Sequence, residues 1–300
     1  MNLPNILGKK HPSFSSRRKI ISRSGKFVKT QEYGLEIDFP TMISHRIPID
    51  PEIMAQQLNS SGGFIVANMG VSASIVLKPE GTEKEYLLVC ICGEQEDKIL
   101  AKLISGYNPS NLTPEQALLG EVAEEILVVD EEEKISQGFF NALGLTSSLP
   151  SKYFKKFLSG SSNYSITDGG SLDYLRSTDS KIVQGLERGR ILYDACFSSA
   201  QIIFPLILKM PLKGSLYHSE DSFNEDSKEL EIHLNKKGIL LLERNKEKFT
   251  GNTFFLVKGE LVPGPRCEKI LLHSSFASKN KKGVVIQKYI PFSDCLEKQE

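Results

Sequence analysis

Residues 106–128 read GYNPSNLTPEQALLGEVAEEILV, and this stretch carries the clearest chemical signal in the chain. Its middle has the marks of a helix start. Thr113 can serve as the N-cap, Pro114 then falls at the first helical position, and Gln116 falls at the third, which completes a capping box. A helix is therefore expected from Pro114 onward.

The same helix gathers acidic side chains on one edge. Because successive helical residues are about 100° apart, Glu121, Glu124 and Glu125 share an arc of about 100°. The adjoining arc is apolar and can pack into a core; its residues are Leu118, Val122 and Ile126. Carboxylates crowded in this way repel one another unless a cation lies among them, and hard oxygen ligands suit Mg²⁺ or Mn²⁺. The alternative interpretation is a solvated helix face.

The whole stretch resembles the Nudix box, whose family form is Gly, five residues, Glu, seven residues, Arg-Glu-apolar-x-Glu-Glu-x-Gly-apolar. Here Gly106 fills the opening glycine, Glu121-Val122-Ala123-Glu124-Glu125 fills the acidic core and Val128 fills the last apolar place. The resemblance implies a Nudix-type α/β/α sandwich with a mixed β-sheet. It also implies a Mg²⁺ or Mn²⁺ site made by Glu121, Glu124, Glu125 and the carbonyl oxygen of Gly106.

Three positions depart from the family form. Leu112 replaces its first Glu, Gly120 replaces its Arg, and Leu127 replaces its closing Gly. In the family that Glu and Arg are understood to pair, and replacing both partners of an ion pair can be nearly neutral. Leu127 removes a left-handed helix terminator, so the helix is expected to end differently. These changes leave open whether full activity is retained.

Composition indicates an ordinary globular protein. The 300 residues include 37 Lys plus Arg and 37 Asp plus Glu, so no global charge favours nucleic acid or membrane. No apolar run reaches the roughly 18–20 residues that span a bilayer, and no secretory signal is evident. An odd number of cysteines without paired spacing favours a reducing compartment, so we expect a cytoplasmic protein. Alternation along a strand predicts Cys90 and Cys92 on one face.

Charge is uneven at the amino terminus. Residues 1–31 hold several Lys and Arg but no acidic residue, and they are interpreted as a basic flexible arm. In this arm Arg17, Arg18 and Lys19 are candidates for contacts with the phosphates of RNA. The alternatives are a solubilising tail and a transit peptide.

The rest of the chain divides into an ordered N-terminal extension at 32–62, a Nudix-like domain at 63–250 with an insertion at about 134–190, and a β-rich segment at 251–300 that can belong to the same domain. A helix is expected near 152–158 within the insertion. Apolar runs bounded by turn residues predict strands at 71–77, 86–92, 99–104, 200–208, 231–234, 238–242, 254–257, 269–273 and 284–289.

Other candidate chemistry is sparse. His218 stands in a polar cluster, within which Glu225 and Glu229 are candidates for an accessory acid, base or metal ligand. Such a residue is what the Nudix resemblance implies after the helix, although a solvated loop is the more common explanation of such a pattern. Cys196 reads as a core residue.

Two functions follow from this sequence. The first is a metal-dependent hydrolase that cleaves the diphosphate of a nucleoside diphosphate linked to another group. The second is a Nudix-fold regulator or scaffold that binds a nucleotide or RNA without efficient cleavage, which the altered positions and the basic arm favour. The identity of the substrate is not specified by the sequence, no membrane partner is expected, and a homodimer stays open.

Overall fold

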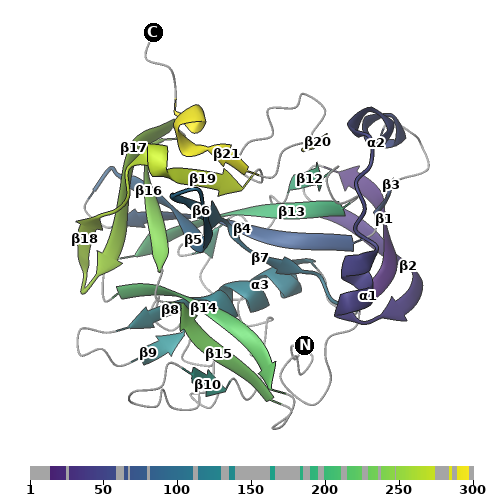
Figure 1. Cartoon of the computed structure of the whole chain (residues 1–300), viewed down its shortest axis with the longest axis horizontal. Helices are drawn as coiled ribbons and strands as arrows, with labels where there is room; N and C mark the ends of the chain where they lie inside the picture. Colours follow the sequence, from purple (N-terminus) through teal and green to yellow (C-terminus); the bar gives the residue numbers. More distant parts are fainter. Residues whose placement is uncertain are drawn as a thin grey trace.

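The structure is a computed structural model that describes residues 14–24, 27–58, 64–66, 68–79, 82–110, 114–129, 135–138, 163–165, 183–184, 190–194, 199–210, 215–224, 229–235, 238–246, 248–273, 284–285 and 289–296. Strands dominate these residues, and they form three sheets with few helices (Figure 1). This arrangement agrees with the general α/β class.

The largest sheet forms the centre of the molecule. Its main strand order is β18 (Glu260–Pro263), β17 (Lys248–Val257), β16 (Ile239–Asn245), β5 (Glu85–Gln95), β4 (Asn68–Pro79), β13 (Ser199–Met210), β12 (Arg190–Asp194) and β20 (Val284–Val285). Shorter strands join it at the sides: β6 (Lys98–Lys102), β7 (Ile104–Tyr107), β11 (Val183–Gln184), β19 (Ile270–His273) and β21 (Tyr289–Pro291).

The central sheet is mixed, as expected. Strands β4 and β13 pair in parallel from Asn68 and Ser199 to Pro79 and Met210, whereas β5 pairs antiparallel with β4 and with β16. Parallel strands are normally covered on both faces, and their sequences are then almost continuously apolar. The runs in β4, β5 and β13 follow this rule.

The sheet branches beside β4 and β5. The first half of β4 pairs with β7, and its last residues pair with β5. Similarly, β5 pairs with β16 up to Cys90 and with β6 from Cys90 onward. Cys90 is therefore the residue of β5 that pairs with both β16 and β6. The site described below lies at this branch of the sheet.

Two apolar clusters cover the two faces of the central sheet. On one face, residues of β4, β5, β13 and β16 pack against Leu118, Val122 and Ile126, which are fully buried. On the other face, a second cluster includes Val89, Leu272 and Phe292, the last from the short helix η5 (Phe292–Cys295). The apolar arc predicted for the helix is thus its core-facing side.

That helix is α3 (Pro114–Glu125), and it lies between the central sheet and a second sheet (Figure 1). The second sheet has the order β10 (Asn163–Ser165), β15 (Glu229–Asn235), β14 (Ser215–Asn224), β8 (Ile126–Val129) and β9 (Ile135–Gly138). Helix α3 passes directly into β8 at Ile126. At the position where the Nudix box has a glycine that ends its helix, this chain has Leu127, and its helix continues directly as a strand.

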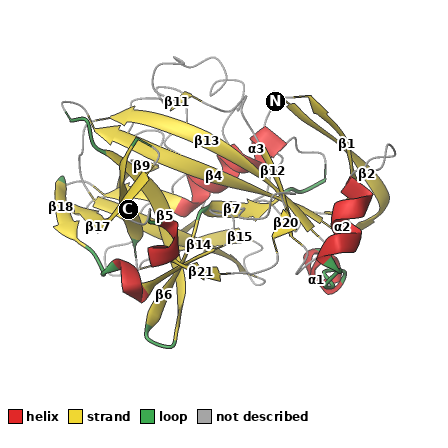
Figure 2. Cartoon of the chain, turned by 90° about the horizontal axis from the view of Figure 1, so that it is seen from above, coloured by secondary structure: helices red, strands yellow, loops and turns green. Residues whose placement is uncertain are grey.

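The N-terminal residues form a third sheet, of β1 (Phe14–Ser24), β2 (Phe27–Ile37) and β3 (Phe64–Val66). Helices α1 (Phe39–Ser44) and α2 (Pro51–Leu58) gather with it at one end of the molecule (Figure 2). Phe14 is buried, and its ring contacts those of Phe39 and Tyr107. From Phe14 on, a strand therefore occupies part of the segment that we expected to be a flexible arm.

Most of the expected strands coincide with strands of the structure, including those at 251–300, where β17, β18 and β19 belong to the central sheet. The two cysteines that were expected on one face differ in exposure: Cys90 is buried and Cys92 is exposed. The register between β5 and β6 shifts between Ile91 and Gly93, and β16 ends its pairing at Cys90, so Cys92 passes beyond the core. The helix expected near 152–158, most of the insertion at 134–190, and Cys196 lie outside the described residues.

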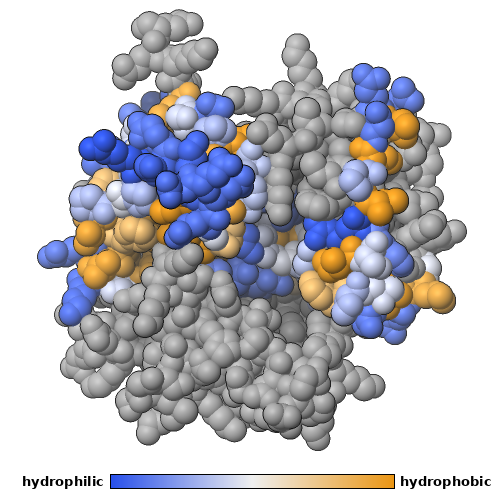
Figure 3. Space-filling view, in the orientation of Figure 1, coloured by the Kyte–Doolittle hydropathy of each residue, from blue (hydrophilic) through white to orange (hydrophobic). Residues whose placement is uncertain are grey.

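The described surface has apolar side chains at two places on the face in Figure 3, over α1 with β2 and over β17 with β18. Exposed members of these groups are Leu35, Phe39, Val257 and Val262. Among the residues that the structure describes, no helix combines the length and the apolar character needed to cross a membrane.

Candidate metal-binding site

The acidic edge of α3 faces β7. Leu118, Val122 and Ile126 are fully buried, whereas Glu121 and Glu125, one helical turn apart, are half-buried at the margin of the core. Glu124 belongs to α3, but its side chain lies outside the described part of the structure. The predicted division of the helix into an apolar arc and a carboxylate edge is therefore present at the described positions.

Gly106 brings β7 close to Glu121. A Cβ atom at Gly106 would lie 1.9 Å from the carboxylate carbon of Glu121, so the carboxylate fills the space that any other residue would need for its side chain. On the neighbouring strand, a Cβ at Gly70 would lie 3.0 Å from the carbonyl oxygen of Gly106. Close approach of the backbone, one of the uses of glycine, thus explains the residue at 106.

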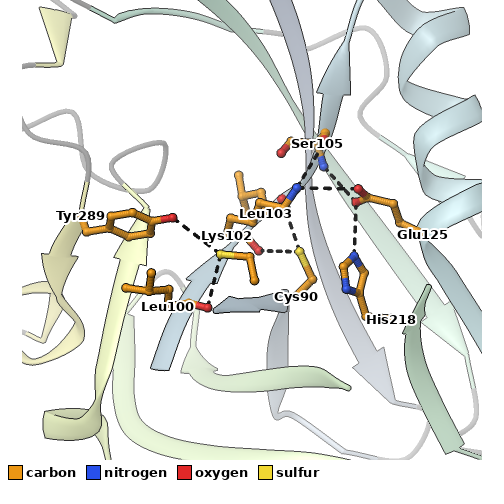
Figure 4. A network of polar contacts seen from close by, with 9 residues as sticks. Cys90, Leu100, Lys102, Leu103, Ser105, Glu125, His218 and Tyr289 are labelled. Carbon is orange, nitrogen blue, oxygen red and sulfur yellow. Dashed lines mark hydrogen bonds and ion pairs between the residues drawn. The ribbon is translucent and has the colours of Figure 1, made fainter. Parts of the chain in front are cut away.

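Glu125 lies at the end of α3 and points into the branch of the central sheet (Figure 4). The backbone N–H of Ser105 donates to its Oε2 at 3.3 Å, and Nζ of Lys102 lies 3.7 Å from its Oε1. Nε2 of His218 lies 3.9 Å from Oε2, which is beyond hydrogen-bonding distance. All three contacts are long for a half-buried carboxylate.

Strand pairing explains why His218 reaches this place. It lies opposite Ile126 in the pairing of β14 with β8, and Ile126 directly follows Glu125. His218 is 3% exposed, and among the described residues neither its Nδ1 nor its Nε2 has a hydrogen-bond partner. Burial, helped by the charge of Lys102, lowers the pKa of His218 to about 4, so the imidazole is neutral and its contact with Glu125 is not an ion pair.

Cys90 completes the cluster from the other side. Its Sγ lies 3.5 Å from the carbonyl oxygen of Lys102 and 3.9 Å from that of Leu103. Burial raises the pKa of the Cys90 thiol well above its ordinary value, and the charge of Glu125 raises it further. One donor atom each from Cys90, Glu125 and His218 lies within 4.8 Å of the other two.

Lys102 supplies positive charge to the site. Burial is the largest single influence and would by itself lower the pKa of its ammonium group, but the effects of Glu125, Cys90, Glu121 and Cys92 together outweigh it. The pKa of Lys102 therefore stands above its ordinary value, and the ammonium group offsets the repulsion between the two described carboxylates.

The donors divide into two kinds. The oxygens of Glu121 and Glu125 beside Gly106 are hard ligands and fit Mg²⁺ or Mn²⁺. The imidazole of His218 and the sulfur of Cys90 are softer, and they fit Zn²⁺ or a related transition metal. Glu125 belongs to both sets of donors, so it links the predicted acidic edge to a cluster that the sequence did not predict.

Other candidates are less well placed. Glu225 lies outside the described residues, and Glu229 begins β15, where its side chain is not described. Arg17, Arg18 and Lys19 lie on β1, and their side chains also lie outside the described part of the structure. Thr113 and Leu112, at the expected helix start, also lie outside the described part of the chain.

Comparison with known proteins adds no relative: no family model, no curated protein and no solved structure matches this chain.

Proposed function

We propose that the chain is a divalent-metal-dependent hydrolase of the Nudix type, which cleaves the diphosphate linkage of a nucleoside diphosphate derivative. The observation that carries this proposal is the packing of the Glu121 carboxylate on Gly106. These are two positions of the box, fifteen residues apart in sequence, and the resemblance requires them to act together. The proposed fold is the Nudix α/β/α sandwich, supported by a mixed sheet with α3 across one face.

In this proposal Glu121, Glu124, Glu125 and the carbonyl oxygen of Gly106 hold Mg²⁺ or Mn²⁺. The ion, when bound, offsets phosphate charge and activates the attacking water. Other residues of the chain position these ligands before the ion binds. Packing of Leu118 and Val122 fixes the rotation of α3, and the N–H of Ser105 orients the Glu125 carboxylate.

Lys102 has a separate role in the same proposal. Its ammonium group lies 3.7 Å from Oε1 of Glu125, so it stabilises an acidic edge that must also exist without the metal. A half-buried cation beside carboxylates also adds positive potential, which favours the approach of a phosphate group.

The test is turnover of nucleoside diphosphate-linked compounds, with and without Mn²⁺, by the whole chain and by Glu121→Gln and Glu124→Gln. Both variants should lose metal-dependent turnover by about a hundredfold or more, because each removes charge from the ligand set. Glu260→Gln is the matched control, since it makes the same change at an exposed position on β18. Equal turnover in all three variants would refute the proposal.

The second candidate is a nucleotide- or RNA-binding regulator with weak or no hydrolysis. Lys102 favours it, because an ammonium group beside Glu125 already offsets charge that a metal would otherwise balance. A binder should show no Mn²⁺-supported turnover but should bind RNA with a strong dependence on salt. Replacing Arg17, Arg18 and Lys19 by Gln is a better probe than deletion of the segment, because deletion would also remove the buried ring of Phe14.

A further inference from the structure

We propose that Cys90, Glu125 and His218 form a second metal site, selective for a softer divalent cation such as Zn²⁺, which joins the central sheet, helix α3 and the second sheet. This site goes beyond the proposed hydrolase function and does not depend on it. It shares only Glu125 with the acidic edge that faces Gly106.

The first argument is the donor set. Thiolate sulfur, neutral imidazole nitrogen and carboxylate oxygen are the three kinds of protein ligand that Zn²⁺ takes. Their donor atoms lie within 4.8 Å of one another. In a tetrahedral zinc site neighbouring donors are about 3.3–3.6 Å apart, so the widest of these separations must close by at most about 1–1.5 Å on binding. Nε2 of His218 and Oε2 of Glu125, at 3.9 Å, need a smaller movement. We expect small rotations of the three side chains to bring the donors together.

The second argument is the state of His218. Its ring is 3% exposed, and both nitrogens lack a hydrogen-bond partner. A buried polar group without a partner is unfavourable, and most buried histidine nitrogens avoid this state. The ring points toward Glu125 (Figure 4). A cation between Nε2, the Glu125 carboxylate and Sγ of Cys90 would give the imidazole the partner that it lacks.

The third argument is that three separate elements of the fold place the ligands next to one another. Cys90 lies at the branch of the central sheet, Glu125 ends α3, and His218 is held opposite Ile126 by the pairing of β14 with β8. The ligands thus come from two sheets and the helix between them. Three protein ligands leave a fourth position for water, as in zinc sites that take part in catalysis. Access is from the side of Glu125, whose side chain is 16% exposed, whereas Cys90 is fully buried.

Lys102 is the competitor of the metal in this proposal. Its ammonium group lies 3.7 Å from Oε1 of Glu125 and supplies the positive charge that the ion would bring. When the ion binds, attraction between Lys102 and Glu121 can hold the ammonium group nearby. Removing this charge while keeping the apolar stem, as in Lys102→Met, should therefore strengthen metal binding. A purely structural ion pair predicts no such gain.

The test uses the whole chain, stripped of metal with a chelator and titrated with Zn²⁺ and with Co²⁺. We expect one tight equivalent of Zn²⁺, a higher Tm when it is bound, and a thiolate-to-cobalt charge-transfer band. Cys90→Ser should lose that band, and both Cys90→Ser and His218→Leu should bind Zn²⁺ at least about tenfold more weakly. Lys102→Met should bind it about tenfold more tightly or better, since it removes a nearby like charge.

The matched controls are Cys92→Ser, an exposed cysteine on the same strand, and His45→Ala, an exposed histidine. Both should bind Zn²⁺ like the unaltered chain. His218→Leu removes a buried group without partners, so it should fold without metal, and Lys102→Met provides an independent readout if Cys90→Ser does not fold. Absence of the cobalt band, equal zinc affinity in His218→Leu, or unchanged affinity in Lys102→Met would overturn the proposal.

The two proposals fail in different ways. Glu124→Gln should remove Mn²⁺-supported turnover but leave zinc affinity unchanged, because Glu124 is not a ligand of the second site. Loss of hydrolysis with intact zinc binding would therefore remove only the proposed function. Hydrolysis with no zinc binding would remove only the further inference.

Discussion

The carboxylates of Glu243 and Glu125 each lie near one lysine, but the contacts described for Glu243 are shorter than those described for Glu125. Glu243, on β16, lies 2.7 Å from Nζ of Lys84 and accepts hydrogen bonds from Thr250 at 2.8 Å and from Asn252 at 2.7 Å. The contacts of Glu125 with Ser105, Lys102 and His218 span 3.3–3.9 Å. The short contacts of Glu243 hold its carboxylate firmly, whereas the three longer contacts described for Glu125 hold that carboxylate less firmly, so it can turn toward another ligand.

The largest expected effect comes from Gly106→Ala, which tests whether the loosely held region serves activity. The new Cβ would take the space of the Glu121 carboxylate, which is the movable end of a flexible side chain. Turnover should fall about a hundredfold, because a displacement of about 1 Å at a reacting site has that effect. The free energy of unfolding should change by less than about 1 kcal/mol, since Glu121 can rotate away.

The matched control for this variant is Gly93→Ala. A Cβ there would lie at an ordinary 3.6 Å from Cδ1 of Leu100. Turnover and denaturant unfolding should both match the unaltered chain. A Gly106→Ala protein with full turnover would show that the packing of Glu121 on β7 is not needed for the reaction.

The next effect compares the two carboxylates directly by the free energy of unfolding. Glu243→Gln should destabilise the chain by about 1–3 kcal/mol, because Thr250 and Asn252 lose a charged acceptor in a buried place. Glu125→Gln should change it by about 0–1 kcal/mol, because its contacts are longer and repulsion from Glu121 is relieved. Chemical denaturation of both variants in the absence of metal measures the difference. Equal losses would erase the proposed distinction between the two sites.

A smaller effect concerns pH. Burial opposes ionisation of Glu243, but the contact with Lys84 and the hydrogen bonds from Asn252 and Thr250 outweigh it, so the pKa of Glu243 is below its ordinary value of 4.5. The unfolded chain then binds the proton more readily, and the stability supplied by ionised Glu243 is present above about pH 4.5 and lost as the pH falls through the folded value. The stability difference between the unaltered chain and Glu243→Gln should shrink in that acid range and remain constant near neutrality.

The smallest effect is expected from Lys84→Met. Lys84 is exposed, so water screens its attraction to Glu243, and the two remaining hydrogen bonds still hold the carboxylate. Its loss of stability should be clearly smaller than that of Glu243→Gln in the same denaturation experiment. A loss as large would mean that the lysine, and not the hydrogen bonds, holds this carboxylate.

The sequence predicted what depends on local signals. Pro114 and the spacing of Leu118, Val122 and Ile126 specify a helix with one buried side, and α3 has that side. The uninterrupted apolar runs predicted most strands of the central sheet. The strand β1 was not predicted, because Ser, Arg and Lys make up most of its residues and its sequence shows no regular alternation of apolar and polar residues.

The part of the site contributed by Cys90, Lys102 and His218 could not be predicted, because it depends on strand register between distant segments. His218 reaches Glu125 only through the pairing of β14 with β8. Cys90 faces Lys102 only because β6 pairs with β5 beyond the branch. The one available signal was His218 itself, which follows Leu216 and Tyr217 and precedes Glu220 and Asp221, and that pattern is also common in solvated loops.

The parallel pairing of β4 with β13 has a consequence for the order in which the molecule is made. The first strand ends at Pro79 and its partner begins at Ser199, so a ribosome must produce about 120 further residues before the two can meet. A nascent chain stopped before Ser199 would already carry all three helix carboxylates. Such a chain would nevertheless leave one edge of β4 without a paired strand, and it would lack His218. We therefore expect chaperones to bind it, and we do not expect it to be active on its own.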